Sequence, residues 1–260
     1  MGFYQTPSLG PAATIPSVKP FEVVNQGSLH DQTHTNLPAV FGKRMERYLE
    51  NQIRQSDTFE VLQENLQIID RGQTIGELDF ILRDKLKQEL VHLELAYKFY
   101  LYDPDEPAEL PRWIGPNRND RLVKKMEKLA AQQFPLLFRG ESQQILEKLN
   151  LPELPWRQEL CFKAQLYLPY QWQHALPPAI NPKAVSGFWI HFKQFKDLQN
   201  AQFFLPAKEN WTVDPALWTE WHNLADVTRQ LENREKNHKA TMCWIKHTGQ
   251  TFEKCFVVWW

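Results

Sequence analysis

Two stretches of alternating apolar and polar residues predict a β-hairpin around which the chain is organised. In residues 76–82, Leu78, Phe80 and Leu82 fall on one face of an extended strand. In residues 91–101, the apolar face consists of Val91, Leu93, Leu95, Tyr97, Phe99 and Leu101. The polar segment 83–90 joins these strands, so we expect an antiparallel hairpin. Its other face carries the polar side chains Glu77, Asp79, His92, Glu94 and Lys98.

Helical periodicity flanks this hairpin on both sides. Residues 38–55 predict a helix with the apolar stripe Phe41, Met45, Tyr48, Leu49 and Ile53, and with Glu46 at the edge of the stripe. Residues 59–69 predict a strand that precedes the hairpin. Residues 118–134 predict a second helix with the stripe Leu122, Met126, Leu129, Ala130 and Gln133. One flank of this helix carries Arg118, Arg121, Lys125 and Lys128, which fits either a solvated, salt-bridged face or a phosphate-binding flank.

Breaks in these patterns suggest three regions. Residues 1–37 hold scattered prolines and no sustained period, which predicts an extended or mobile N-terminal arm. Residues 38–150 contain the elements described above, and Pro152 and Pro155 mark their end. Residues 151–260 predict short strands with one helix near residues 215–235, and they hold nine of the ten tryptophans. Buried packing is a commoner role for such tryptophans than base stacking.

Composition places the chain among ordinary globular proteins. Hydrophobic residues make up 42% and charged residues 23% of 260 positions, and the net charge of −1 argues against coating nucleic acid by charge alone. The three cysteines show no metal-ligand spacing, which suits a reducing compartment. We see neither a signal peptide nor an apolar run of the roughly 18 residues that a membrane-spanning helix needs. A cytoplasmic location without membrane attachment is therefore expected.

The polar face of the hairpin is the strongest candidate for chemistry. Asp79 and Glu94 would lie side by side on adjacent strands, and facing carboxylates repel each other unless a positive group lies between them. Mg²⁺, which takes one or two carboxylates and keeps several waters, would relieve that repulsion. Lys98 on the same face would stabilise developing charge, and Glu46 would add a ligand from the first helix. The alternative is an amphipathic hairpin with an ordinary solvated face, on which polar residues such as Glu77 and His92 have no chemical role.

The hairpin also resembles the core of the PD-(D/E)XK nuclease superfamily. The residues that carry this resemblance are GELDF at 76–80, HLE at 92–94, and Lys98. Members of the superfamily run helix, three strands, helix, strand, which is the order expected here from residue 38 to residue 134. By this resemblance Asp79 and Glu94 would bind Mg²⁺ or Mn²⁺, and Lys98 would assist catalysis. Glu46 would be a further metal ligand. Independently of the resemblance, Glu77 and His92 are auxiliary candidates because they lie on the same polar face of the hairpin, where His92 could supply a proton or a contact.

Two positions depart from the superfamily pattern. Leu78 stands where the superfamily name places proline. The usual lysine follows the glutamate by two residues, and that position here is Ala96. Lys98 lies on the same face of the strand but about 7 Å further along it.

A second resemblance covers most of the chain. The segments FGKRMERYLE, GELDFIL, HLELAYKFYLY and WIGPNRNDRL resemble a bacterial family that is known as a domain of unknown function and is grouped with these nucleases. The fold expected is α/β: a restriction-endonuclease-like core of a helix, a three-stranded antiparallel start, a helix and a strand, followed by the strand-rich extension.

Two functions remain open from the sequence. The first is a Mg²⁺-dependent phosphodiesterase that acts on nucleic acid, in which Arg118, Arg121, Lys125 and Lys128 steer the phosphate backbone. The second is a protein that keeps the nuclease fold without its catalysis and binds nucleic acid or another protein. Ala96 and the near-neutral charge favour the second, whereas the clustering of Glu46, Asp79, Glu94 and Lys98 favours the first.

Overall fold

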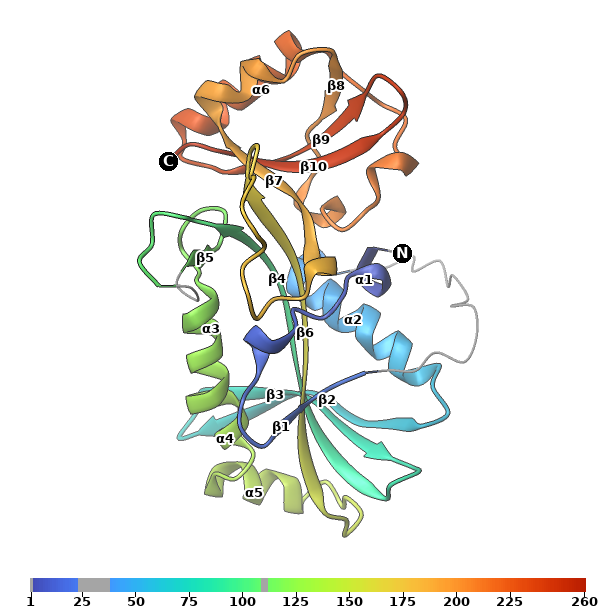
Figure 1. Ribbon diagram of the computed structural model, residues 1–260. Helices are drawn as coiled ribbons and strands as arrows, with labels where there is room; N and C mark the ends of the chain where they lie inside the picture. The colour runs from blue at the N-terminus through green and yellow to red at the C-terminus, as the bar shows by residue number, and fades with distance from the viewer. Residues whose placement is uncertain (1, 23–37, 109–111) are drawn as a thin grey trace. The chain divides into compact units, whose positions relative to one another are not determined.

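The protein has a mixed α/β structure with both parallel and antiparallel strand pairs (Figure 1). The structure, a computed structural model, describes residues 2–22, 38–108 and 112–260. Its α-helices are α1 (Gly2–Gln5), α2 (Phe41–Arg54), α3 (Leu122–Lys128), α4 (Phe134–Leu136), α5 (Gly140–Glu147) and α6 (Leu224–Lys236). Its strands are β1 (Val18–Pro20), β2 (Phe59–Asp70), β3 (Gln73–Asp84), β4 (Glu89–Tyr102), β5 (Trp113–Ile114), β6 (Trp156–Pro169), β7 (Val185–His191), β8 (Ala201–Phe204), β9 (Thr241–His247) and β10 (Phe252–Val258).

These elements divide between two compact units, each built from separate segments of the chain. The first unit combines Ala13–Tyr97 with Lys125–Phe162, and the second combines Met1–Ala12, Lys98–Lys124 and Lys163–Trp260. Strands β4 and β6 therefore contribute residues to both units. This division differs from the three regions expected from the sequence, with breaks after residues 37 and 150. The prolines near residue 150 precede strand β6.

The expected N-terminal arm contains short ordered elements. It includes α1 and β1, and β1 pairs in parallel with β6 so that Val18 lies opposite Gln158. Phe3, Leu9 and Phe21 are buried. Elements of three or four residues are too short to produce a recognisable period, so the sequence pattern did not reveal them. Residues 23–37 of the expected arm lie outside the described residues.

The first unit contains the expected helix and three strands as α2, β2, β3 and β4. Strand β3 pairs antiparallel with both β2 and β4, and the strand order is β2-β3-β4-β6. The turn between β3 and β4 is shorter than expected, because β3 runs to Asp84 and β4 begins at Glu89.

A single apolar cluster packs the helices that follow β4 against β2 and β3. It comprises Ile68, Leu78, Ile81, Leu136, Leu137 and Leu146. A Cβ atom on Gly76 would lie only 2.5 Å from Cδ2 of Leu136. Glycine at this position therefore lets the segment around α4 approach β3 closely.

The polar face of β4 is not solvated, so the alternative of an ordinary exposed hairpin face is wrong. His92 and Glu94 are fully buried, and so are their apolar neighbours Val91 and Leu93. Strand β4 is an inner strand, between β3 and β6, so both of its edges are paired. Side chains from the segment after α3 complete the cover, since the ring of Phe134 contacts that of His92.

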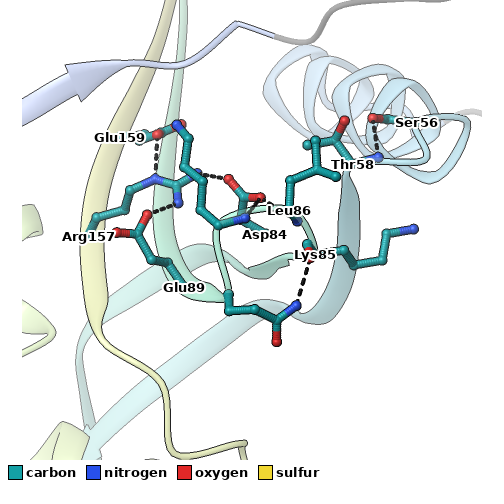
Figure 2. Close-up of polar contacts among 10 residues, drawn as sticks. Ser56, Thr58, Asp84, Lys85, Leu86, Glu89, Arg157 and Glu159 are labelled. Carbon is teal, nitrogen blue, oxygen red and sulfur yellow. Dashed lines mark hydrogen bonds and ion pairs between the residues drawn. The ribbon is translucent and has the colours of Figure 1, made fainter.

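Arg157, in the second position of β6, ties that strand to the hairpin (Figure 2). Its Nη2 donates to Oδ2 of Asp84 at 2.7 Å and its Nε donates to Oε1 of Glu159 at 2.7 Å. Its Nη1 forms a further ion pair with Glu89. Asp84 and Glu89 stand on either side of the hairpin turn, so one buried guanidinium fixes both strands.

The Asp84 carboxylate also organises the turn itself. Its Oδ1 accepts hydrogen bonds from the N–H groups of Leu86 at 3.0 Å and Lys87 at 2.9 Å. Burial tends to raise the pKa of Asp84, but the bonds from Lys87 and Arg157 outweigh burial and hold the pKa below its ordinary value. These contacts fix the register of β3 on β4, and hence which residues meet at the far end of the ladder.

The second unit has the strand order β6-β7-β10-β9-β8. Strand β7 is parallel to both β6 and β10, whereas β9 is antiparallel to β10 and β8. Its core comprises Ile190, Phe195, Leu198, Phe203, Val227, Leu231, Cys243, Ile245, Cys255 and Val257. The helix expected over residues 215–235 begins later, at Leu224, because the side chain of Asn223 caps it by accepting the N–H of Asp226.

The sequence predicts a chain without a membrane-spanning helix, in a reducing cytoplasmic compartment. Within the described ranges, no helix is long and apolar enough to cross a membrane. Cys161, Cys243 and Cys255 are buried. The cytoplasmic location itself stays a prediction.

Candidate carboxylate site

Asp79 and Glu94 meet where the ladder between β3 and β4 ends. The last pair of the ladder at this end is Phe80 with Leu93, and Asp79 and Glu94 are the next residues on the two strands. The N–H of Leu95 donates to Oδ2 of Asp79 at 2.8 Å, so a side-chain carboxylate takes the place of a backbone acceptor. In return, the backbone N–H of Asp79 donates to the carboxyl group of Glu94. The sequence correctly predicted these two carboxyl groups as neighbours.

Both carboxyl groups have raised pKa values, and burial is the main cause for each. Burial, followed by repulsion from Glu94, raises the pKa of Asp79 to about 7. Burial is also the main cause that raises the pKa of Glu94 to about 8, with smaller contributions from the charges of Glu77 and Glu46. Glu94 is fully buried, whereas Asp79 keeps partial exposure. Asp79 is therefore the carboxylate that a ligand from solution would reach first.

Hydrogen-bond donors hold both oxygens of Glu94. Oε1 lies 2.9 Å from Nε2 of His92, and Oε2 accepts a bond of 2.5 Å from Nε2 of Gln133. A carboxylate that accepts several hydrogen bonds is favoured in its ionised form, which opposes the effect of burial. Glu94 is thus rigidly oriented by groups from β4 and from the segment that follows α3.

A third residue fixes the tautomer of His92. The side-chain nitrogen of Gln158 donates to Nδ1 of His92 at 3.0 Å and to the carbonyl oxygen of Phe134 at 2.7 Å. Because Nδ1 accepts this bond, the proton of the neutral imidazole lies on Nε2 and points at Glu94. Burial lowers the pKa of His92 to about 4, so the imidazole is neutral near pH 7. His92 orients the glutamate and carries no charge.

Glu46 and Glu77 lie near the pair, and one lysine holds them. Nζ of Lys43 lies 2.8 Å from Oε2 of Glu46, 2.7 Å from Oε1 of Glu77 and 2.6 Å from Oδ1 of Asn65. Burial raises the pKa of Glu46, and the charge of Asp79 raises it further. The Glu46 carboxylate thus forms an ion pair with Lys43, and its role as a metal ligand stays a prediction.

Lys125 is a cation of the site that the sequence assigned to the helix surface. Its Nζ donates to Oε1 of Gln133 at 2.8 Å, and Gln133 in turn binds Glu94. The positive charge of Lys125 favours the ionised forms of both Asp79 and Glu94. A signal was present in the sequence, because Gln133 lies on the otherwise apolar stripe of the predicted helix, and a polar residue there needs a buried partner.

The other predicted site residues have partners of their own. Nζ of Lys98 forms a 2.6 Å ion pair with Asp120. Arg118 and Arg121 precede α3 and pair with Asp103 at 3.0 Å and Glu106 at 2.6 Å. Lys128 is exposed at the end of α3. The catalytic and nucleic-acid-binding roles suggested for these residues stay predictions.

The chemistry of Asp79 and Glu94 fits a hard divalent cation. Two carboxylates that repel each other gain stability from a cation between them, and Mg²⁺ prefers oxygen ligands. Among the described residues, no group of three or more His, Cys, Asp or Glu side chains is arranged to hold a metal ion. A pair of carboxylates nevertheless satisfies Mg²⁺, which keeps several of its waters.

The fold and this site define a mixed α/β protein with a buried carboxylate pair at the open end of a β-hairpin. A family model described as a domain of unknown function (DUF1853) matches residues 20–258. The chain belongs to this family. No curated protein and no solved structure matches the chain.

Proposed function

We propose that this protein is a Mg²⁺-dependent phosphodiesterase that acts on nucleic acid, with Asp79 and Glu94 as the metal ligands. The observation that carries the proposal is the placement of these two carboxyl groups. They lie side by side at the end of a strand ladder, with raised pKa values and with Lys125 as the cation that acts on both. The resemblance of the hairpin to the PD-(D/E)XK nucleases supports the same assignment.

Each carboxylate of the site would have a different role in binding the metal. Asp79, which is partly exposed, would bind the metal directly, and Glu94 would bind it in the orientation set by His92 and Gln133. Glu46 would become an auxiliary ligand if it left its ion pair with Lys43. Mg²⁺ bound there would neutralise the carboxylates and offset the charge that develops on a phosphate during hydrolysis.

Specific observations favour a second candidate, a protein that keeps the nuclease fold and only binds a partner. Ala96 occupies the usual position of the catalytic lysine, and Lys98 is paired with Asp120. Arg118 and Arg121 are also paired with carboxylates, which reduces their charge toward a phosphate backbone. A protein of this kind would not hydrolyse phosphodiesters with any metal.

A cleavage assay distinguishes the two candidates. The protein is incubated with Mg²⁺ or Mn²⁺ and end-labelled single-stranded, duplex and branched DNA and RNA. The phosphodiesterase proposal predicts cleavage that needs the metal and falls at least about 100-fold in Asp79→Asn. Asp70→Asn is the matched control, since Asp70 is a partly exposed carboxylate at the end of the neighbouring strand β2.

Three outcomes count against the proposal. Cleavage that Asp79→Asn leaves unchanged would place the activity at another site or in a contaminant. Cleavage lost equally in Asp70→Asn would remove the link to the carboxylate pair. Failure to cleave any substrate, by a protein that binds one of them, would favour the binding module.

A further inference from the structure

We propose that Lys125 on α3, and not Lys98, is the lysine that serves the carboxylate site. This inference rests on the proposed phosphodiesterase function and names one of its working residues. The usual strand position is occupied by Ala96, so the lysine of this site would have to come from another element. Helix α3 and the turn that follows it supply one.

The two hydrogen bonds that link Lys125 to Glu94 through Gln133 have a fixed direction. Lysine can only donate and a carboxylate can only accept, so the amide of Gln133 must direct its oxygen at Lys125 and its nitrogen at Glu94. Both bonds are short, at 2.8 Å and 2.5 Å. Gln133 therefore acts as a tether that holds the ammonium group next to the carboxylate pair.

A π-helical turn over Leu129–Gln133 brings the two tethered residues into line. Lys125 and Gln133 are eight residues apart, and in a regular α-helix that spacing leaves them about 80° apart around the axis. A π turn takes more residues per turn than an α turn, which reduces this offset. The irregularity therefore lies between the two residues that have to face the same way.

The other nearby lysines are committed elsewhere. Lys43 binds Glu46, Glu77 and Asn65, and Lys98 binds Asp120. Lys125 instead acts electrostatically on both Asp79 and Glu94, and its side chain is only half-buried.

The test compares Mn²⁺ affinity and cleavage rate among four variants. The titration is run at pH 9, above the pKa values of both carboxyl groups, so that protons compete little with the metal. Lys125→Met removes a positive charge beside the metal ligands, so Mn²⁺ should bind about threefold to tenfold more tightly there. At saturating Mn²⁺, cleavage by this variant should fall about 100-fold. Lys125→Arg keeps the charge and should keep the wild-type Mn²⁺ affinity. Lys124→Met, an exposed neighbour on the same helix, is the matched control and should change neither quantity. Lys98→Met tests the rival assignment.

Several results overturn this inference. A Lys125→Met protein that binds Mn²⁺ and cleaves like the wild type would overturn it. A loss of cleavage that is confined to Lys98→Met would overturn it as well. If Lys125→Met fails to fold, Gln133→Leu is used instead, because it removes the side chain that holds Lys125. This variant should also cleave more slowly, and unchanged cleavage would contradict the inference. A wild-type protein that binds no Mn²⁺ refutes the phosphodiesterase proposal and this inference together. Wild-type binding with an unaltered affinity in Lys125→Met refutes only this inference.

Discussion

Replacing Asp79 by asparagine should stabilise the metal-free protein at pH 8. Asparagine keeps the shape of aspartate, and its amide oxygen can accept the bond from the N–H of Leu95. It carries no charge, so it removes both the cost of burying an ionised carboxylate and the repulsion from Glu94, which are the two main causes of the raised pKa. A residue that lowers stability in the absence of its ligand is typical of a functional site.

The magnitude follows from the pKa of Asp79. Its ordinary value of 3.8 rises to about 7 in the folded protein. A difference of roughly 3 units corresponds to roughly 4 kcal/mol at about 1.36 kcal/mol per unit. Because the folded state holds the proton more tightly, this stability is present below about pH 4 and is lost as the pH rises through about 7. The advantage of Asp79→Asn should therefore approach roughly 4 kcal/mol at pH 8 and fall to roughly 1 kcal/mol at pH 4.5.

The assay must report on the first unit alone, because the two units need not unfold together. Hydrogen exchange of the Phe80 and Leu93 amides in increasing urea, with chelator present, meets this need, since both residues are the last ladder pair before the site. Asp70→Asn controls for the general effect of removing one negative charge. A destabilised Asp79→Asn protein at pH 8, or an advantage that does not change with pH, would refute the reasoning.

Three further predictions concern the groups around this pair. Glu94→Gln should cost roughly 1–3 kcal/mol in urea unfolding, because both oxygens accept bonds and the new amide nitrogen would face another donor; unchanged stability would contradict this network. Nitrogen NMR should show His92 neutral, with its proton on Nε2, from pH 8 to pH 5, since its pKa is lowered to about 4; protonation near pH 6.5 would contradict its burial. Arg157→Met should cost roughly 3–5 kcal/mol and speed exchange of the Leu86 amide, because it leaves Asp84 buried without its cation; a loss below roughly 1 kcal/mol would show that the ion pair is dispensable.

The hairpin and its carboxylate pair could be predicted because they depend on local rules. Alternation of side chains in a strand assigns each residue to a face, and an antiparallel turn sets which residues become neighbours. Asp79 and Glu94 could be paired on these grounds alone. The sequence pattern predicts too long a turn, over 83–90, because Asp84 and Glu89 are polar residues that belong to the strands and bind Arg157.

The surroundings of the pair could not be predicted in the same way. Alternation shows that a strand has two different faces, but it does not show which other segments cover them. The cover here comes from Gln133 and Phe134, about forty residues further along the chain, and from Gln158 on β6. The turn of Lys125 toward the pair accompanies a π-helical irregularity that has no compositional signature.

The division into units escaped sequence reasoning for a related reason. Strands β4 and β6 each have 14 residues, and each contributes to both units. A boundary that passes through the middle of a continuous strand leaves no proline, glycine or charge run to mark it. The prolines near residue 150 instead mark the loop before β6.

The central claim is that Asp79 and Glu94 form a site for a divalent cation, and calorimetric titration with Mn²⁺ at pH 8 tests it most directly. Wild-type protein should bind Mn²⁺, while Asp79→Asn and Glu94→Ala should bind it at least about tenfold more weakly. At pH 7 the wild type should release protons on binding, because both carboxyl groups have pKa values near or above 7 without the cation. Absence of Mn²⁺ binding by the wild type, with or without a short oligonucleotide, would contradict the account.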